Sequence, residues 1–235
     1  MAHSFTEEEK HGVYRAIAER RDVRSQFLPT PIPDAVLARL LWAAHRAPSV
    51  GLMQPWEFIV IRDAAVKQRV CGLFEQTDRK AAGIYEGERR MLYDSLKLAG
   101  ILEAPINLCV TCHPAISRGS GLGRQTMPET AHYSSVCAVQ NLWLAARAED
   151  IGVGWVSILD PAELRQALTI PPEVDPVAYL CLGYVNEFLS RPELEIKGWE
   201  QSVPLAELIH FDGYGGKDSD RAIRLAGSSV AENAE

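Results

Sequence analysis

Three arginines and one aspartate lie within five residues, at Arg20-Arg21-Asp22-Val23-Arg24. A guanidinium carries a planar fork of donors that matches phosphate, and it stays charged at any working pH. If the run is extended, side chains alternate, so Arg20, Asp22 and Arg24 share one side and Arg21 faces the other. The run therefore fits a phosphate clamp with a carboxylate beside the ligand. It also fits an exposed patch of mutually screened charges, and taken alone these residues favour that simpler interpretation.

A second group of polar side chains lies in a proline-bounded loop before an apolar segment, residues 58–61, which predicts a buried strand. Ser49, Met53 and Gln54 place a hydroxyl, a thioether and an amide in this loop. Such a loop on a rigid scaffold can position ligand contacts. The alternative, favoured without other observations, is a plain turn between prolines.

Three other motifs are assigned structural roles. Cys109 and Cys112 have the spacing of a redox or metal pair, but there is no second pair and they lie in an apolar strand. The glycines of residues 119–123 match neither the dinucleotide nor the P-loop spacing. His132, alone near a helix start, is interpreted as structural. We therefore expect no metal site and no nucleotide site at these places.

The composition is that of a soluble globular protein, with 47% hydrophobic and 23% charged residues in a chain of 235. We see no linker that divides it, so residues 1–235 are interpreted as a single domain. A net charge of -7 argues against nucleic acid or an anionic membrane as the main partner. No apolar run is long enough to span a bilayer, and the acidic N-terminus lacks the form of a signal peptide. Five cysteines, an odd number, indicate buried thiols in a reducing compartment, and we expect a cytoplasmic protein.

Helices and strands predicted from the periodicity place the two polar groups. Thr6 and Glu9 have the spacing of a capping box for a helix that runs into the arginine run. A second helix starts near Asp34 and stops before Pro48. Residues 63–102 favour helix, interrupted at 83–90 by a polar stretch that fits a helical excursion or lid. Residues 106–112 then read as a strand.

The second half of the chain contains its most apolar helix, residues 131–149. This helix is apolar nearly all round, so we expect it to be central, buried on all sides and completed by a second subunit. Strands are predicted at residues 152–158, where glycines permit close backbone approach, and at 177–185. Between them, Asp160 and Glu163 cap a short helix. After Glu187 an apolar arm is expected to wrap a neighbouring subunit, and residues 217–235 are expected to be disordered.

Together these segments resemble the flavin-dependent nitroreductase family. The segments that carry the resemblance are Arg20-Arg21-Asp22-Val23-Arg24, Ala47-Pro48-Ser49, Gln54-Pro55-Trp56, Gln140-Asn141-Leu142 and Gly152-Val153-Gly154-Trp155. Asp22 stands where the general family usually has serine. With Pro48-Ser49-Val50-Gly51, Gly154-Trp155-Val156-Ser157 and Lys197-Gly198-Trp199, it resembles a branch that makes 5,6-dimethylbenzimidazole from its own flavin. The resemblance covers about Val13 to Tyr214.

The resemblance implies an α+β fold, with a mixed β-sheet flanked by helices, an extended C-terminal arm, and FMN at the interface of a homodimer. It implies that the arginine run and Arg191 bind the phosphate and ribityl region, and that the loop at Ser49 lies on the flavin-ring side, contributed by the other subunit. Residues 83–90 match a lid that leaves little room for nicotinamide. The cofactor-binding residues implied are Arg20, Arg21, Asp22, Val23, Arg24, Ser49, Met53, Gln54, Trp155, Val156, Ser157 and Arg191.

The reaction implied consumes the flavin: reduced FMN and O2 give 5,6-dimethylbenzimidazole, the lower ligand of cobalamin, and erythrose 4-phosphate. An external flavin reductase would supply the reduced FMN. The alternatives are an NAD(P)H-dependent nitroreductase or flavin reductase, and a flavin-binding protein without catalysis.

Asp22 and Ser157 match the two catalytic positions of the branch. A carboxylate near guanidiniums is expected to have a lowered pKa and to stay ionised, ready to accept or relay a proton. A serine hydroxyl can both donate and accept. The alternative is that Asp22 is only a structural partner of the arginines.

Overall fold

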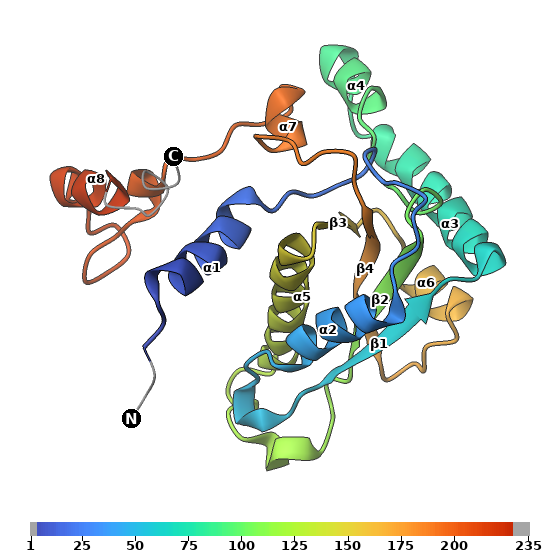
Figure 1. The fold of residues 1–235 in the computed structure, drawn as a ribbon, viewed down its shortest axis with the longest axis horizontal. Coiled ribbons are helices and arrows are strands. Elements are labelled where there is room, and N and C mark those ends of the chain that lie inside the picture. Colours follow the sequence, from blue (N-terminus) through green and yellow to red (C-terminus); the bar gives the residue numbers. More distant parts are fainter. Residues whose placement is uncertain (1–3, 228–235) are drawn as a thin grey trace.

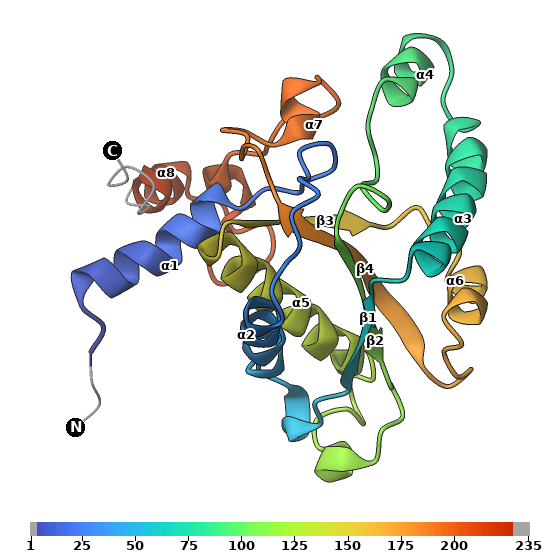
Figure 2. The same ribbon diagram turned by 45° about the vertical axis from the view of Figure 1, so that its right-hand side comes forward.

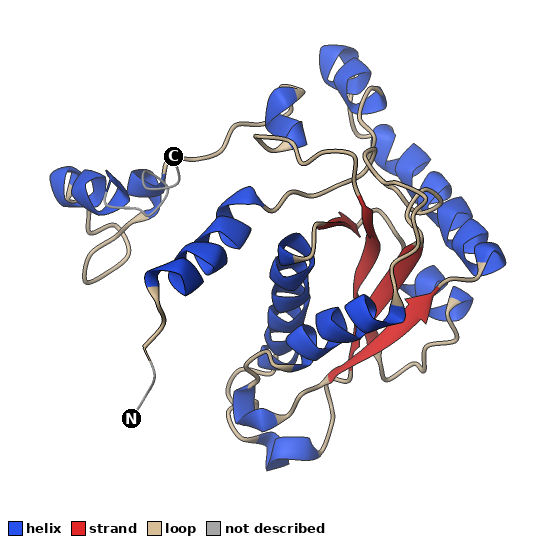
Figure 3. Cartoon of the chain, viewed as in Figure 1, coloured by secondary structure: helices blue, strands red, loops and turns tan. Residues whose placement is uncertain are grey.

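The computed structural model describes residues 4–227. Helices and strands alternate along the chain, with helices in excess (Figure 3). The helices are α1 Glu7–Glu19, α2 Asp34–His45, α3 Ala64–Ala82, α4 Gly87–Asp94, α5 Thr130–Ala148, α6 Pro161–Ala167, α7 Glu193–Ile196 and α8 Ser219–Gly227. The strands are β1 Trp56–Ile61, β2 Ile106–Cys112, β3 Ile151–Val156 and β4 Asp175–Tyr184. Short 3-10 turns lie at η1 Val50–Leu52, η2 Arg118–Gly121 and η3 Leu205–Leu208.

The four strands form one sheet in the order β1-β2-β4-β3, and every neighbouring pair is antiparallel. The expected α+β class is confirmed, but the expectation of a mixed sheet is corrected. Among the described residues, the parallel pairing is a single bridge that joins Asp22, which lies outside the four strands, to Val153 of β3. β2 is buried along its whole length because it lies inside the sheet. β1 lies at the edge, so only Trp56 and Ile61 are buried, which corrects the expectation of a buried strand there.

Helices cover both faces of the sheet (Figure 2). On one face, α2 and α5 pack against it and share a core cluster that includes Leu40 and Leu142, both fully buried. On the other face, α3 and α6 contribute Val70 and Leu164 to a second cluster. This packing holds α5 and β3 in place, and the site described below is built on these two elements.

Helix α5 is buried on one side only. Its inward residues include Ala138, Leu142 and Ala146, which are fully buried. Tyr133 and Val136 on the same helix remain 56% and 40% exposed. The expectation of burial on all sides is therefore not met within one chain, because the sheet and α2 cover only part of the helix circumference.

The first and last helices of the described residues lie outside the layered body. α1 buries no residue, and α1 and α8 both project away from the sheet (Figure 1). Thr6 and Glu9 form the predicted capping box at the start of α1. The tail expected to be disordered from residue 217 contains α8, which packs on η3. Residues 228–235 lie outside the described residues.

Two local predictions are confirmed, the cap at Asp160 and the burial of Cys109 and Cys112. Asp160 accepts hydrogen bonds from the N–H groups of Ala162 and Glu163 at the start of α6. All five cysteines are free thiols, and Cys109 and Cys112 are fully buried. In residues 4–227 no helix is long and apolar enough to cross a membrane, and no cluster of three or more His, Cys, Asp or Glu side chains is placed to hold a metal ion.

Candidate functional site: a carboxylate held in the arginine run

The arginine run leaves α1 in an extended conformation and reaches the free edge of β3. Arg20 caps the helix with φ -60° and ψ 142°, and Val23 N–H donates to the carbonyl of Val153 over 3.0 Å. A Cβ at Gly154 would lie 2.0 Å from the carbonyl oxygen of Val23. The close approach predicted from the glycines of β3 is therefore confirmed, and the approaching group is the backbone of the arginine run.

Asp22 is held through both carboxylate oxygens. Its Oδ1 accepts from the backbone N–H of Trp155 over 2.9 Å, and its Oδ2 forms an ion pair with Arg24. The side chains of Asp22 and Arg24 are 31% and 12% exposed. The carboxyl group is therefore turned toward β3 and fixed in orientation.

Burial raises the pKa of Asp22, and the opposing effects of Arg24, the Trp155 N–H and Arg20 do not cancel it. The expectation of a lowered pKa is therefore wrong. Removing a carboxylate from water costs more here than the neighbouring cations return. The sequence shows the guanidiniums, but it does not show that folding places the carboxyl group against β3 and removes much of it from water.

The three arginines of the run take different directions. Arg24 lies with Asp22, whereas Arg21 turns away, so the predicted alternation is confirmed for this pair. Arg21 donates through Nη2 to the carbonyl of Ser190 over 2.5 Å, which brings it to the segment that carries Arg191. The guanidinium of Arg20 lies 5.4 Å from the centre of the Trp143 ring.

Ser157 follows the end of β3 and is exposed. It lines a pocket of about 250 Å³ together with Trp155, Val156 and the start of α6. Trp155 is therefore close to both predicted catalytic residues. Its backbone N–H donates to Asp22, and Ser157 follows two residues later, directly after the end of β3. No hydrogen bond links Ser157 to Asp22 in the part of the chain that the structure describes.

The loop at residues 49–54 is built largely by its own side chains. Ser49 Oγ accepts from the N–H of Gln54 over 3.1 Å, which stabilises a turn in which Gln54 has a positive φ of 42°. Met53 is only 1% exposed and packs with Cys112 and Ala131. Its thioether is therefore turned into the core, and Ser49 and Gln54 are the members of this group with exposed surface.

The loop and the arginine run contact opposite ends of α5. Val50 N–H donates to Ser134 Oγ near the start of the helix, whereas Trp143 Nε1 donates to the carbonyl of Arg21 near its end. Nine residues of helix separate these contacts, about 13 Å along the axis. Within one chain the two halves of the predicted site are therefore apart.

The segment expected to be a lid spans a turn and the first half of α4. Tyr85 and Tyr93 stack with ring centres 4.9 Å apart, and Trp199 packs edge-on against Tyr85. Arg89 lies 3.6 Å above the Trp199 ring and donates to the Trp199 carbonyl over 2.8 Å. The C-terminal arm therefore holds α4 in place through an aromatic cluster.

Two residues of α5 lie at the arginine run, although the sequence predicted only that they belong to the apolar helix. Trp143 touches both Arg20 and Arg21, and Arg147 pairs with Glu19 directly before the run. The available signal was their spacing of four residues, which places both on one face of the helix. Their partner segment lies more than a hundred residues earlier, so the spacing could not identify it.

The arginine run fits a phosphate group. The Nε of Arg21 is buried and has no hydrogen-bond partner among the described residues. Three guanidiniums within five residues provide the planar, permanently charged donors that phosphate requires. The fold and the site thus define a protein of the nitroreductase class.

Comparison with known proteins places the chain in that class. The sequence pattern of the Nitroreductase family matches residues 17–184, and the chain belongs to this family. A protein of Rhodospirillum rubrum named 5,6-dimethylbenzimidazole synthase is 47% identical over 185 residues, which are 79% of this chain and 87% of that protein. A protein of the same name from Rhodobacter capsulatus is 41% identical over 202 residues, 86% of this chain and 97% of that protein.

A solved structure shares the fold. Oxidized iodotyrosine deiodinase, crystallised with FMN and 3-iodo-L-tyrosine, superposes with a TM-score of 0.67 at 20% identity. The match covers 86% of this chain and 99% of that one.

Proposed function

We propose that this protein converts reduced FMN and O2 to 5,6-dimethylbenzimidazole and erythrose 4-phosphate. The observation that carries the proposal is the carboxyl group of Asp22, which is desolvated, fixed through both oxygens and set in an arginine run that fits phosphate. The name of the two relatives described above supports the same reaction. An ordinary flavin reductase has no evident use for a buried carboxyl group at this place.

Asp22 would act as the proton acceptor or relay. Its raised pKa makes the carboxylate a stronger base than an ordinary aspartate, and general bases work best when their pKa approaches the working pH. The Trp155 N–H and Arg24 hold the two oxygens, so the carboxylate needs little reorientation before it accepts a proton. Ser157 would position a polar group of the substrate through its hydroxyl. The flavin itself supplies the redox chemistry with oxygen.

The arginines would hold the phosphorylated end of the substrate. Arg24 lies with Asp22 and Arg20 lies near the Trp143 ring, and Arg21 with Arg191 would approach from the C-terminal arm. Val23 contributes its backbone only, since its side chain is 2% exposed. This arrangement would place the ribityl chain, which follows the phosphate, beside the carboxylate.

A homodimer would complete the site. The loop with Ser49 and Gln54 lies at the far end of α5 from the arginine run, so the ring-side contacts of each flavin would come from the partner chain. Met53 would contribute through its backbone, and Trp155 and Val156 through the β3 edge. The exposed apolar residues of α1 and α8 provide surface for such an association.

A lid over the flavin would explain why a separate reductase supplies the reduced FMN. α4 and Trp199 would cover the flavin and leave little room for nicotinamide. A cytoplasmic location is part of the proposal, because all five cysteines are free and free thiols are typical of a reducing compartment.

Product analysis tests the proposal directly. FMN reduced in the absence of oxygen is mixed with the protein and exposed to air, and the mixture is separated by chromatography. We expect 5,6-dimethylbenzimidazole to form as FMN disappears. Intact FMN after many aerobic cycles, with steady consumption of NAD(P)H and a nitro compound, would instead identify a nitroreductase. Intact FMN without turnover would identify a flavin-binding protein.

A further inference from the structure

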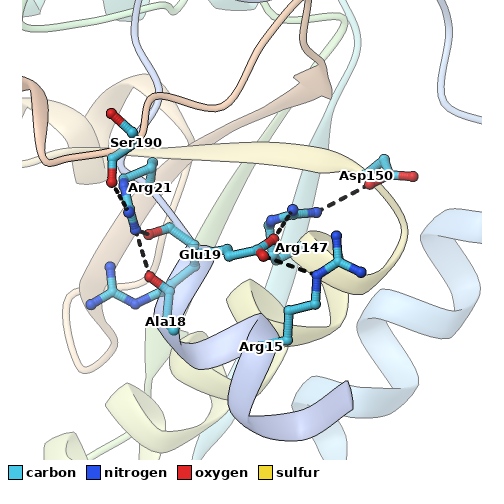
Figure 4. A network of polar contacts seen from close by, with 8 residues as sticks. Arg15, Ala18, Glu19, Arg21, Arg147, Asp150 and Ser190 are labelled. Atoms are coloured by element: carbon cyan, nitrogen blue, oxygen red, sulfur yellow. Dashed lines mark hydrogen bonds and ion pairs between the residues drawn. The ribbon is translucent and has the colours of Figure 1, made fainter. Parts of the chain in front are cut away.

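The last turn of α5 carries Arg147, which pairs with Glu19 of α1 and with Asp150 (Figure 4). Arg147 Nη2 lies 2.5 Å from Glu19 Oε2, and its Nη1 lies 3.1 Å from Asp150 Oδ1. Its guanidinium also lies 4.3 Å from the centre of the Phe188 ring. Only 14% of the side chain is exposed. Arg147 thus joins the end of α1, the turn between α5 and β3, and the segment after β4.

Two of these contacts lie beside the groups that hold Arg21. Glu19 is the last residue of α1 and comes directly before the arginine run. Phe188 lies two residues before Ser190, whose carbonyl accepts from Arg21 Nη2. The conformation of Arg21 therefore depends on two chain segments, and Arg147 contacts both.

Trp143, one helical turn earlier, holds the backbone of the run. Its Nε1 donates to the carbonyl of Arg21 over 3.3 Å, and the Arg20 guanidinium lies near its ring. Residues four apart share a face of a helix. One face of α5 therefore supports the arginine run at Trp143 and at Arg147.

The chemistry requires arginine at this place. A guanidinium can offer separate nitrogens to two carboxylates in its own plane while its flat face stacks on an aromatic ring. A lysine ammonium is a single point charge and cannot bind both carboxylates and stack in the same geometry. The three contacts of Arg147 use all of these features.

We infer that Arg147 is a positioning residue for the flavin phosphate. It does not contact the phosphate, but it fixes the end of α1 and the segment at Phe188, so that Arg20 and Arg21 are in place before FMN binds. This inference rests on the proposed role of the arginine run. A purely structural ion pair would stabilise the fold without changing the preference for a phosphorylated flavin.

Arg15 provides a matched control. Its Nε donates to the other oxygen of Glu19 over 2.9 Å, and its side chain is 60% exposed. In residues 4–227 its polar contacts end there. Arg15→Met therefore removes the same charge from the same carboxylate, but leaves Phe188 and Asp150 in contact with Arg147.

The test compares FMN with riboflavin, which has the same ring and ribityl chain but no phosphate. Dissociation constants of both oxidised flavins are measured by fluorescence quenching for the wild type, Arg147→Met, Arg147→Lys and Arg15→Met. We expect Arg147→Met to reduce the preference for FMN about tenfold, as when hydrogen bonds to a charged group are lost, with riboflavin affinity unchanged. Arg147→Lys should show a smaller loss, and Arg15→Met a change of less than about twofold.

An unchanged preference in the Arg147 variants, or equal weakening of both flavins, would overturn the inference. If Arg147→Met does not fold, Arg147→Lys decides the question because it keeps the charge. A wild-type protein that prefers FMN but forms no benzimidazole would refute the proposed reaction and leave the role of Arg147 intact. A wild-type protein that binds both flavins equally would refute the phosphate clamp and this inference together.

Discussion

Asp22 differs from an ordinary surface aspartate because desolvation and orientation act on the same carboxyl group. Arg24 and the Trp155 N–H would normally lower the pKa of a carboxyl group, yet burial raises it. The result is a carboxylate that is fixed in direction and more basic than in water. Those are the properties that a proton acceptor needs.

Replacing Asp22 with Asn should separate binding from chemistry. The amide oxygen can still accept from Trp155 N–H, and loss of a negative charge near the phosphate should keep or tighten FMN binding. Benzimidazole formation should fall by about 100-fold or more, the usual contribution of a general base. The product is quantified after aerobic exposure of reduced FMN. Asp34→Asn, at an exposed carboxylate paired with Arg62, is the control, and a fully active Asp22→Asn protein would contradict the proposed role.

The titration of Asp22 has a defined direction. Because its folded pKa is raised, the carboxylate gains its proton at a higher pH than a free aspartate, whose pKa is about 3.9. Its proton-accepting form is therefore lost earlier as the pH falls. By linkage, stability from the protonated group is present below the unfolded pKa and is lost as the pH rises through the folded pKa. Carbon-13 NMR of the side-chain carboxyl, assigned with Asp22→Asn, should show a midpoint above about 3.9, and a lower midpoint would refute the desolvation argument.

At the scale of elements, β3 positions the site by admitting another backbone at its edge. The carbonyl of Val23 occupies the space where a side chain at Gly154 would stand. The strand can therefore bind Asp22 through the next N–H group, that of Trp155. α5 supports the same run from the other side through Trp143 and Arg147.

Gly154→Ala should disturb the site through this contact. The new Cβ would lie 2.0 Å from a backbone oxygen, so the arginine run must move, at a cost of about 1–3 kcal/mol or more in the free energy of unfolding. Benzimidazole formation should fall as Asp22 is displaced. Gly72→Ala in α3 is the control, because nothing lies within 4 Å of its added Cβ, and it should stabilise by about 0.5–1 kcal/mol. Denaturant unfolding measures both, and equal stability of the two variants would contradict the steric argument.

At the scale of the whole molecule, the two groups of predicted site residues lie apart within one chain. The ends of α5 separate Ser49 from Asp22, and apolar side chains remain exposed on α1, α8 and η3. On α1 these are Val13, Tyr14 and Ile17, which are 46–54% exposed. A monomer would leave both the site and this surface unsatisfied.

We therefore expect the protein to be a dimer in sedimentation experiments. The double substitution Tyr14→Glu and Ile17→Glu introduces charge into the exposed apolar side of α1 and should produce monomers that bind FMN weakly. Gln76→Glu, on an exposed position of α3, should leave the dimer and FMN binding unchanged. A monomeric wild type with full FMN affinity would contradict the shared site.

Local patterns in the chain were sufficient for many of the elements. Caps at Thr6 and Asp160, and the buried strand at residues 106–112, depend on residues close together in sequence. The resemblance to the nitroreductase family also depends on local patterns, because its motifs are short and their order along the chain is preserved. The close approach at Gly154 was also foreseen, since a glycine in a strand indicates the space but not its occupant.

The remaining features depend on contacts between distant segments. The pKa of Asp22 was expected to fall because its neighbours in sequence are cations, and it rises because folding removes much of its carboxyl group from water. Met53 turns into the core, and Arg147 joins segments more than a hundred residues from one another, for the same reason. Residue types and short spacings thus defined the candidate chemistry, whereas desolvation and orientation arise only when the chain packs, since both are set by neighbours that the linear order does not reveal.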